Sequence, residues 1–301
     1  MRRLPGPLLI ALATVLWGTT GTTQELAPDA ATPLTVGALR LLVAAATLLA
    51  IAAATGHLRE LRGMRRPATL VAATGVAVYQ PFFFLAVGRT GVVLGTIVAI
   101  GSAPIFAGLL AWMVDRKPPS RLWTGATVFA IAGVALLVAA GREVGVNAEG
   151  IAFALVAGAA YATYVIAARQ FAREGNVIRS TTIIFALASA LLLPLLGTSD
   201  LGWVGTTGGV VAVLHLGVLA TAVAYLLFAS GLSTTRSTTA TTLTLGEPMT
   251  AALLGVVAVG ERPPLLGWAG FILILIALVA VATEGRSSRF LGTRGRASVA
   301  P

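Results

Sequence analysis

Residues 33–54, PLTVGALRLLVAAATLLAIAAA, form an apolar run that is interrupted by one charged residue, Arg40. A helix needs about 20 mostly apolar residues to cross the hydrocarbon core of a bilayer. Nine other runs resemble it, which gives ten predicted spans: 7–24, 33–54, 68–87, 91–113, 120–140, 148–169, 178–197, 207–229, 237–259 and 264–283. The sequence therefore predicts an all-α membrane protein with ten transmembrane helices.

The composition excludes several classes of protein. Hydrophobic residues make up 57% of the chain and charged residues 11%, whereas soluble domains carry about 25% charged residues. The absence of cysteine and the presence of only two histidines argue against metal clusters and cysteine nucleophiles. We expect no enzyme activity, no bound cofactor and no metal.

The basic residues gather in alternate loops. If the N-terminus is inside the cell, 17 of the 21 Lys and Arg residues face inward, 3 lie in outer loops, and Arg40 lies within a span. Because cytoplasmic loops carry an excess of Lys and Arg, we predict a multi-pass protein of the plasma (inner) membrane with both termini in the cytoplasm. The lipid bilayer then accounts for the net charge of +10, and no nucleic-acid partner is expected.

The chain repeats itself at an offset of about 144 residues, which places Pro104 in the fourth span opposite Pro248 in the ninth. Each half holds five spans, so the second half enters the membrane from the opposite face, as in the inverted repeats of many secondary transporters. We predict three parts: an N-terminal repeat at 1–143, a C-terminal repeat at 144–285, and a basic, disordered cytoplasmic tail at 286–301.

Several short motifs resemble one known family. Trp17-Gly18, Arg40, Leu245-Gly246-Glu247-Pro248 and Gly260-Glu261-Arg262-Pro263 are similar to the EamA family of the drug/metabolite transporter superfamily, over roughly residues 7–284. The resemblance implies two inverted five-helix repeats around a central cavity, and export or uptake of metabolites, amino acids or drugs. The first half departs from the pattern, since it has Ala103-Pro104 where the second half has Glu247-Pro248.

Two charged residues inside spans are candidates for substrate binding or coupling. Glu247 is the one carboxylate that we place deep in a span, and Arg40 lies about a third of the way into the second span. Ionisable groups within the membrane are functional hypotheses by default, and a guanidinium binds carboxylates with two hydrogen bonds. The alternatives are structural: Glu247 stabilises a helix break, and Arg40 pairs with a carboxylate or extends toward an interface.

The two matched prolines predict helix breaks in spans four and nine. A proline inside a helix frees the carbonyl four residues earlier, which would be that of Ile100 for Pro104 and that of Thr244 for Pro248. Thr244 is therefore a candidate site residue, to which a protonated Glu247 would donate. Kinking for packing explains the prolines equally well, and threonines also bond back to their own helix.

Polar aromatic and amide side chains within spans are the remaining candidates: Trp17, Tyr79, Gln80 and Tyr161. We interpret His215 as a hydrogen-bonded packing residue. The favoured function is a secondary transporter that moves small polar metabolites (amino acids, related compounds or drugs) by alternating access. A channel or a lipid flippase is the alternative. The expected partners are a small-molecule substrate, the lipid bilayer and, as one arrangement, a second copy in a homodimer.

Overall fold

Apolar runs of this length fold as helices because a bilayer offers no water to satisfy backbone N–H and C=O groups. The computed structural model describes residues 4–20, 23, 28, 30–61, 67–116, 118–139, 147–197, 199–254, 256–257 and 264–294, and no strand occurs in these ranges. Its elements are α1 (Gly6–Gly18), α3 (Pro33–Ala54), η1 (His57–Leu61), α4 (Pro67–Asp115), α5 (Arg121–Ala139), α6 (Ala148–Arg173), α7 (Val177–Leu196), η2 (Gly202–Gly205), α8 (Thr207–Leu214), η3 (His215–Val223), α9 (Ala224–Leu232), α10 (Ser237–Leu243), α11 (Gly246–Leu254) and α12 (Leu265–Arg294).

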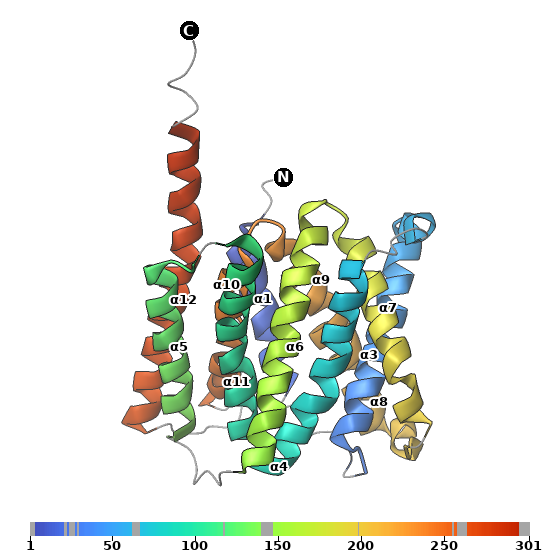
Figure 1. Ribbon diagram of the computed structural model, residues 1–301. Helices are drawn as coiled ribbons and strands as arrows, with labels where there is room; N and C mark the ends of the chain where they lie inside the picture. Colours follow the sequence, from blue (N-terminus) through green and yellow to red (C-terminus); the bar gives the residue numbers. More distant parts are fainter. Residues whose placement is uncertain are drawn as a thin grey trace.

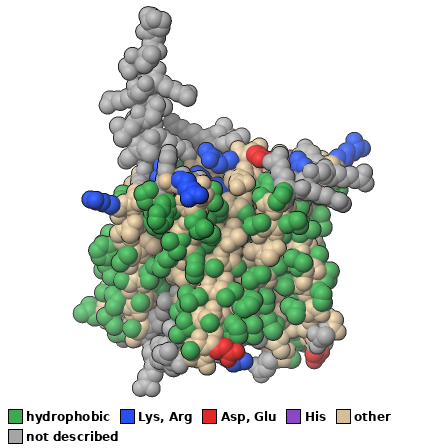
Figure 2. All heavy atoms as spheres, in the orientation of Figure 1, with side chains coloured by type: hydrophobic (Ala, Val, Ile, Leu, Met, Phe, Trp, Pro, Cys, Tyr) green, Lys and Arg blue, Asp and Glu red, His purple; other side chains and the backbone are tan. Residues whose placement is uncertain are grey.

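The helices form a multi-pass membrane bundle. Six are long and apolar enough to cross a membrane, and three shorter apolar helices accompany them at Gly6–Gly18, Val98–Val114 and Arg121–Leu136. Each of the ten predicted spans contains helix among the described residues. The flank of the bundle is covered with hydrophobic side chains (Figure 2), as a surface in contact with lipid tails requires.

The long helix α4 contains two spans and reverses direction between them. A Cβ atom added at Gly95 would lie 3.0 Å from Cα of Val87, although a straight helix separates such positions by about 12 Å. The chain therefore folds back near these residues, and Figure 1 shows the two limbs of α4 on either side of a turn at one end of the bundle. A small apolar cluster, in which Ala86 and Ala99 of α4 pack on Ala154 and Ala157, joins both limbs to α6.

The eighth and ninth spans depart from regular α-helix in different ways. Helices α8 and α9 are joined without a gap by η3, a π-helical segment, into one span at Thr207–Leu232. In the ninth span α10 ends at Leu243 and α11 begins at Gly246. This interruption brings two helix ends into the interior of the bundle.

The start of α1 and the end of α12 lie at the same end of the bundle (Figure 1). Basic side chains gather at this end in Figure 2. Helix α12 continues to Arg294, and the disorder expected of the tail stays a prediction. Residues 295–301, like the predicted motif at Gly260–Pro263, lie outside the described residues.

Candidate functional site

Arg40 lies two turns into α3, a helix whose N-terminus is capped by the side chain of Thr32. Its side chain is 9% exposed, and its Nε donates a hydrogen bond of 3.0 Å to Oγ1 of Thr221 on η3. Its two terminal nitrogens form no hydrogen bond or ion pair with any residue that the structure describes. Because a charged group in apolar surroundings needs partners, Arg40 has the capacity to bind another group.

Glu247 lies in the first turn of α11, directly after the interruption of span nine. Its backbone N–H donates to the carbonyl of Thr244 at 2.9 Å. Pro248 occupies the same first turn, where backbone N–H groups lack intrahelical partners and a proline is tolerated. The predicted interruption is therefore present, but it begins at Thr244. The expectation that the Thr244 carbonyl needs the Glu247 side chain is wrong, because a backbone group already bonds to that carbonyl.

The other predicted break behaves differently. Pro104 is buried inside α4, and the chain is helical on both sides of it. Pro81 is likewise enclosed in α4. The two halves of the chain thus carry matching prolines, but the helix stops only in the second half.

Glu247 and Arg40 interact electrostatically without forming an ion pair. Glu247 is half-buried, and its carboxylate has no hydrogen bond or ion pair within the described part of the chain. The charge of Arg40 interacts with that of Glu247, although their N and O atoms are more than 4.0 Å apart. Both charges also interact with Tyr79 and Tyr225. One positive and one negative group therefore lie close to the same two tyrosines.

An aromatic cluster includes these two tyrosines. The ring of Trp17 lies 5.0 Å from that of Tyr225, 5.4 Å from that of Phe228 and 6.5 Å from that of Tyr161. Tyr79 in turn lies 5.5 Å from Tyr161. Trp17, Tyr79 and Tyr161, which were predicted from three separate spans, are thus brought together by the fold.

Several polar atoms in and near this cluster are buried without a hydrogen-bond partner. They include Nε1 of Trp17, the hydroxyl of Tyr161 and both amide atoms of Gln80. A buried polar group without a partner costs about 1–3 kcal/mol, and native proteins contain few of them. Such groups are expected where a ligand completes the hydrogen bonds.

The structure does not bring every candidate into one site. Gln80 is 1% exposed, and no hydrogen bond joins its side-chain amide to a charged or aromatic candidate among the described residues. The hydroxyl of Thr244 donates to the carbonyl of Thr241 at 2.7 Å, within its own helix. This is the alternative that the sequence left open for the threonines.

Thr221, Tyr225 and Phe228 are not among the site residues named above from the sequence. All three lie in the eighth span, whose π-helical segment changes which side chains share a face. A search for side chains at i, i+3 and i, i+4 spacing on an ideal α-helix would miss this change of face.

His215 forms hydrogen bonds with Thr23 at 2.9 Å and with Thr19 at 3.4 Å. These bonds confirm the interpretation of His215 as a hydrogen-bonded packing residue.

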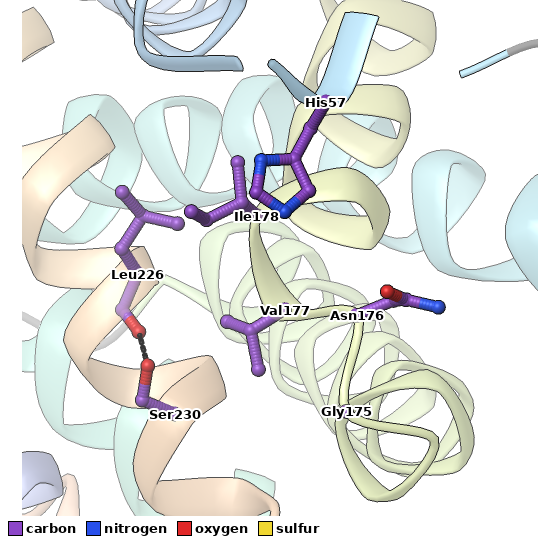
Figure 3. A pocket seen from close by; sticks show the side chains of 7 residues that line it. All are labelled: His57, Gly175, Asn176, Val177, Ile178, Leu226 and Ser230. Atoms are coloured by element: carbon purple, nitrogen blue, oxygen red, sulfur yellow. Dashed lines mark hydrogen bonds between the residues drawn. The ribbon is translucent and has the colours of Figure 1, made fainter. Parts of the chain in front are cut away.

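A separate pocket of about 410 Å³ lies at the end of the bundle where α6 meets α7 (Figure 3). Its lining comes from the turn before α7, from the first residues of α7, from α9 and from η1, and His57, Ile178 and Leu226 lie around it. None of the site residues predicted from the sequence lines this pocket.

Comparison with known proteins gives a consistent picture. The sequence profile of the EamA-like transporter family matches residues 4–139 and 148–283, one copy in each half. The transporter YwfM of Bacillus subtilis is 39% identical over 282 residues, which cover 94% of this chain and 95% of that protein. The threonine/homoserine exporter RhtA of Escherichia coli is 29% identical over 258 residues, 84% of this chain and 82% of the exporter.

A solved crystal structure shares the fold. It superposes with a TM-score of 0.79 over 93% of this chain and 98% of its own, at 20% sequence identity.

Proposed function

Because the chain belongs to the EamA-like transporter family, we propose that it is a secondary transporter of amino acids or closely related small zwitterions. The substrate binds between Arg40 and Glu247, and the protein works by alternating access. No bound cofactor takes part.

The observation that carries this proposal is a separated pair of opposite charges. Arg40 and Glu247 both lie within apolar spans, interact electrostatically, and yet form no ion pair with each other. Unpaired charges in a membrane are costly. A zwitterion satisfies both at once, because its carboxylate binds the guanidinium and its ammonium group binds the carboxylate of Glu247.

The aromatic cluster supplies the remaining contacts. An ammonium group near the face of an aromatic ring is attracted by about 0.5–2 kcal/mol, and Tyr79 interacts with both charged residues. Nε1 of Trp17 and the hydroxyl of Tyr161 are donors without partners among the described residues. These groups favour a substrate with a small polar side chain.

One relative supports the substrate class. RhtA is named as an exporter of threonine and homoserine, both of which are zwitterions with a hydroxylated side chain, and it aligns with most of this chain. We therefore take L-threonine and L-homoserine as the first compounds to test.

The proposal includes an architecture. In this proposal residues 1–143 and 144–285 form inverted repeats around a central cavity, and the match of the family profile once in each half supports the repeat. Both termini face the cytoplasm, in keeping with the basic side chains at the end where α12 finishes. The helix end at Glu247 belongs to the part of the protein that moves during alternating access, because interrupted helices near the membrane midplane hold substrates in other transporters.

The test is counterflow in proteoliposomes. Purified protein is reconstituted with unlabelled L-threonine or L-homoserine inside, and uptake of the labelled amino acid is followed. A carrier accumulates label transiently and saturably. A channel gives no counterflow, and a flippase moves labelled lipid instead.

Matched variants locate the site. Arg40→Gln and Glu247→Gln should each reduce counterflow by about tenfold or more, because each removes a charge-assisted contact. Arg89→Gln is the control, since Arg89 pairs with Glu149 and both are half exposed. The proposal fails if the wild type shows no counterflow with any amino acid, or if both site variants match the control.

A further inference from the structure

The hydroxyl of Thr221 makes two hydrogen bonds at the centre of the π-helical segment η3. It donates to the carbonyl of Leu216 at 2.7 Å and accepts from Nε of Arg40 at 3.0 Å. Thr221 is fully buried. Because a hydroxyl has a single proton, the bond to Leu216 leaves a lone pair for Arg40, so the two bonds are compatible.

The bond to Leu216 depends on the π-helical turn. In an α-helix a threonine hydroxyl bonds back to the carbonyl three or four residues earlier, whereas here the carbonyl lies five residues earlier. The wider turn of η3 therefore determines where the Thr221 hydroxyl lies. Such π-helical turns are frequent at functional sites.

Close packing of η3 on α3 at Gly217 keeps η3 near Arg40. A Cβ atom added at Gly217 would lie 2.5 Å from Cβ of Val43 and 3.3 Å from the carbonyl oxygen of Arg40. A larger residue at 217 would push η3 away from α3. The distance between Thr221 and Arg40 is thus set by two closely packed helices.

This arrangement selects which edge of the guanidinium is free. Arginine offers five N–H donors in a planar fork, and a carboxylate accepts from two of them in parallel. With Nε bonded to Thr221, the two terminal nitrogens are left, and they make no hydrogen bond to the described residues. We propose that Thr221 is a positioning residue that orients Arg40 so that its two terminal nitrogens receive the carboxylate of the substrate. This inference rests on the proposed function of Arg40.

The test separates recognition of the carboxylate from folding. Binding of L-threonine and of L-threonine amide, which lacks the carboxylate, is measured on purified full-length protein. Thr221→Val keeps the shape and removes the hydroxyl, and Thr221→Ser keeps the hydroxyl. Thr182→Val is the matched control, because Thr182 is also fully buried and donates back to a carbonyl at 2.7 Å, that of Ile178, but has no arginine partner.

We expect Thr221→Val to weaken L-threonine binding by about tenfold, as for the loss of a hydrogen bond to a charged group. Binding of the amide should change by less than about twofold. Thr221→Ser and Thr182→Val should keep the wild-type ratio of the two affinities. Equal weakening of acid and amide in Thr221→Val, or no weakening of either, would overturn the inference.

A second comparison tests the inference if the Thr221→Val protein does not fold. Lysine has no Nε–H group of the arginine kind, so in an Arg40→Lys background Thr221→Ala and wild-type Thr221 should bind L-threonine equally. In the Arg40 background Thr221→Ala should lose the discrimination between the acid and the amide. A Thr221→Ala protein that still prefers the acid as strongly as the wild type refutes the positioning role. If the wild type itself binds acid and amide alike, the assignment of Arg40 fails first, and the two failures are therefore distinguishable.

Discussion

Replacing Trp17 by phenylalanine is expected to separate stability from binding. Trp17 is 5% exposed and its Nε1 has no hydrogen-bond partner in the described residues. Loss of part of the indole costs about 1.5 kcal/mol or less, as for other conservative changes in a core. Removal of an unpaired buried donor stabilises the folded protein by about 1–3 kcal/mol. The empty protein should therefore keep its stability within about 1 kcal/mol, or gain slightly.

The same change removes a donor that the substrate is proposed to use. Binding of L-threonine by Trp17→Phe should weaken by about fivefold to tenfold, the effect of one hydrogen bond. The assay is thermal unfolding of purified protein in detergent, with and without the amino acid, since a ligand that binds the folded state raises the apparent melting temperature.

Trp203→Phe is the control for this experiment. Trp203 is 4% exposed and its Nε1 also lacks a partner in the part of the chain described, but it packs in a separate cluster with Val36 and Leu216. Both variants should melt alike without ligand, and only Trp17→Phe should lose the shift caused by L-threonine. Equal shifts in the two variants would refute the role of Trp17 as a substrate donor.

Three further outcomes follow from the structure. Glu247→Gln should fold and insert, and its residual transport should lack the pH dependence of the wild type; an unchanged rate and pH profile would make Glu247 structural. Arg89→Ala should change stability by less than about 1 kcal/mol, because its ion pair with Glu149 is half exposed, and chemical denaturation would reveal a larger loss. A reporter fused after Pro301 that is active only outside the cytoplasm should stay silent, and a strong signal would reverse the proposed orientation.

The spans were predictable because hydropathy alone decides which segments enter a bilayer. Hydropathy does not say how one span ends and the next begins. The reversal inside α4 falls near Gly88-Arg89-Thr90-Gly91, between the predicted spans 68–87 and 91–113, but no proline marks it there and the structure keeps these residues helical. The tight approach of Gly95 to Val87 is a tertiary contact, and no local pattern announces it.

The candidate site was predictable where a residue is unusual for a membrane. Arg40 and Glu247 stand out as charges in apolar runs, and Trp17 and Tyr161 as polar rings. Thr221 does not stand out, since threonines are common in this chain and its importance depends on a π-helical turn. The sequence HLGVLATAV at residues 215–223 fits α- and π-helix equally well, because both place apolar side chains toward lipid and toward the bundle.

The reversal in α4 also bears on how the protein is made. The two limbs are joined within a continuous helical stretch. The connection between them is therefore too short for one limb to cross the membrane while the other stays in water. They would leave the translocation machinery as a hairpin, with their turn drawn across the membrane in a single step. Arg89, which forms an ion pair with Glu149 at the start of α6, would cross the membrane in that step. A hydrophilic tag placed between residues 88 and 95 would have to cross with it.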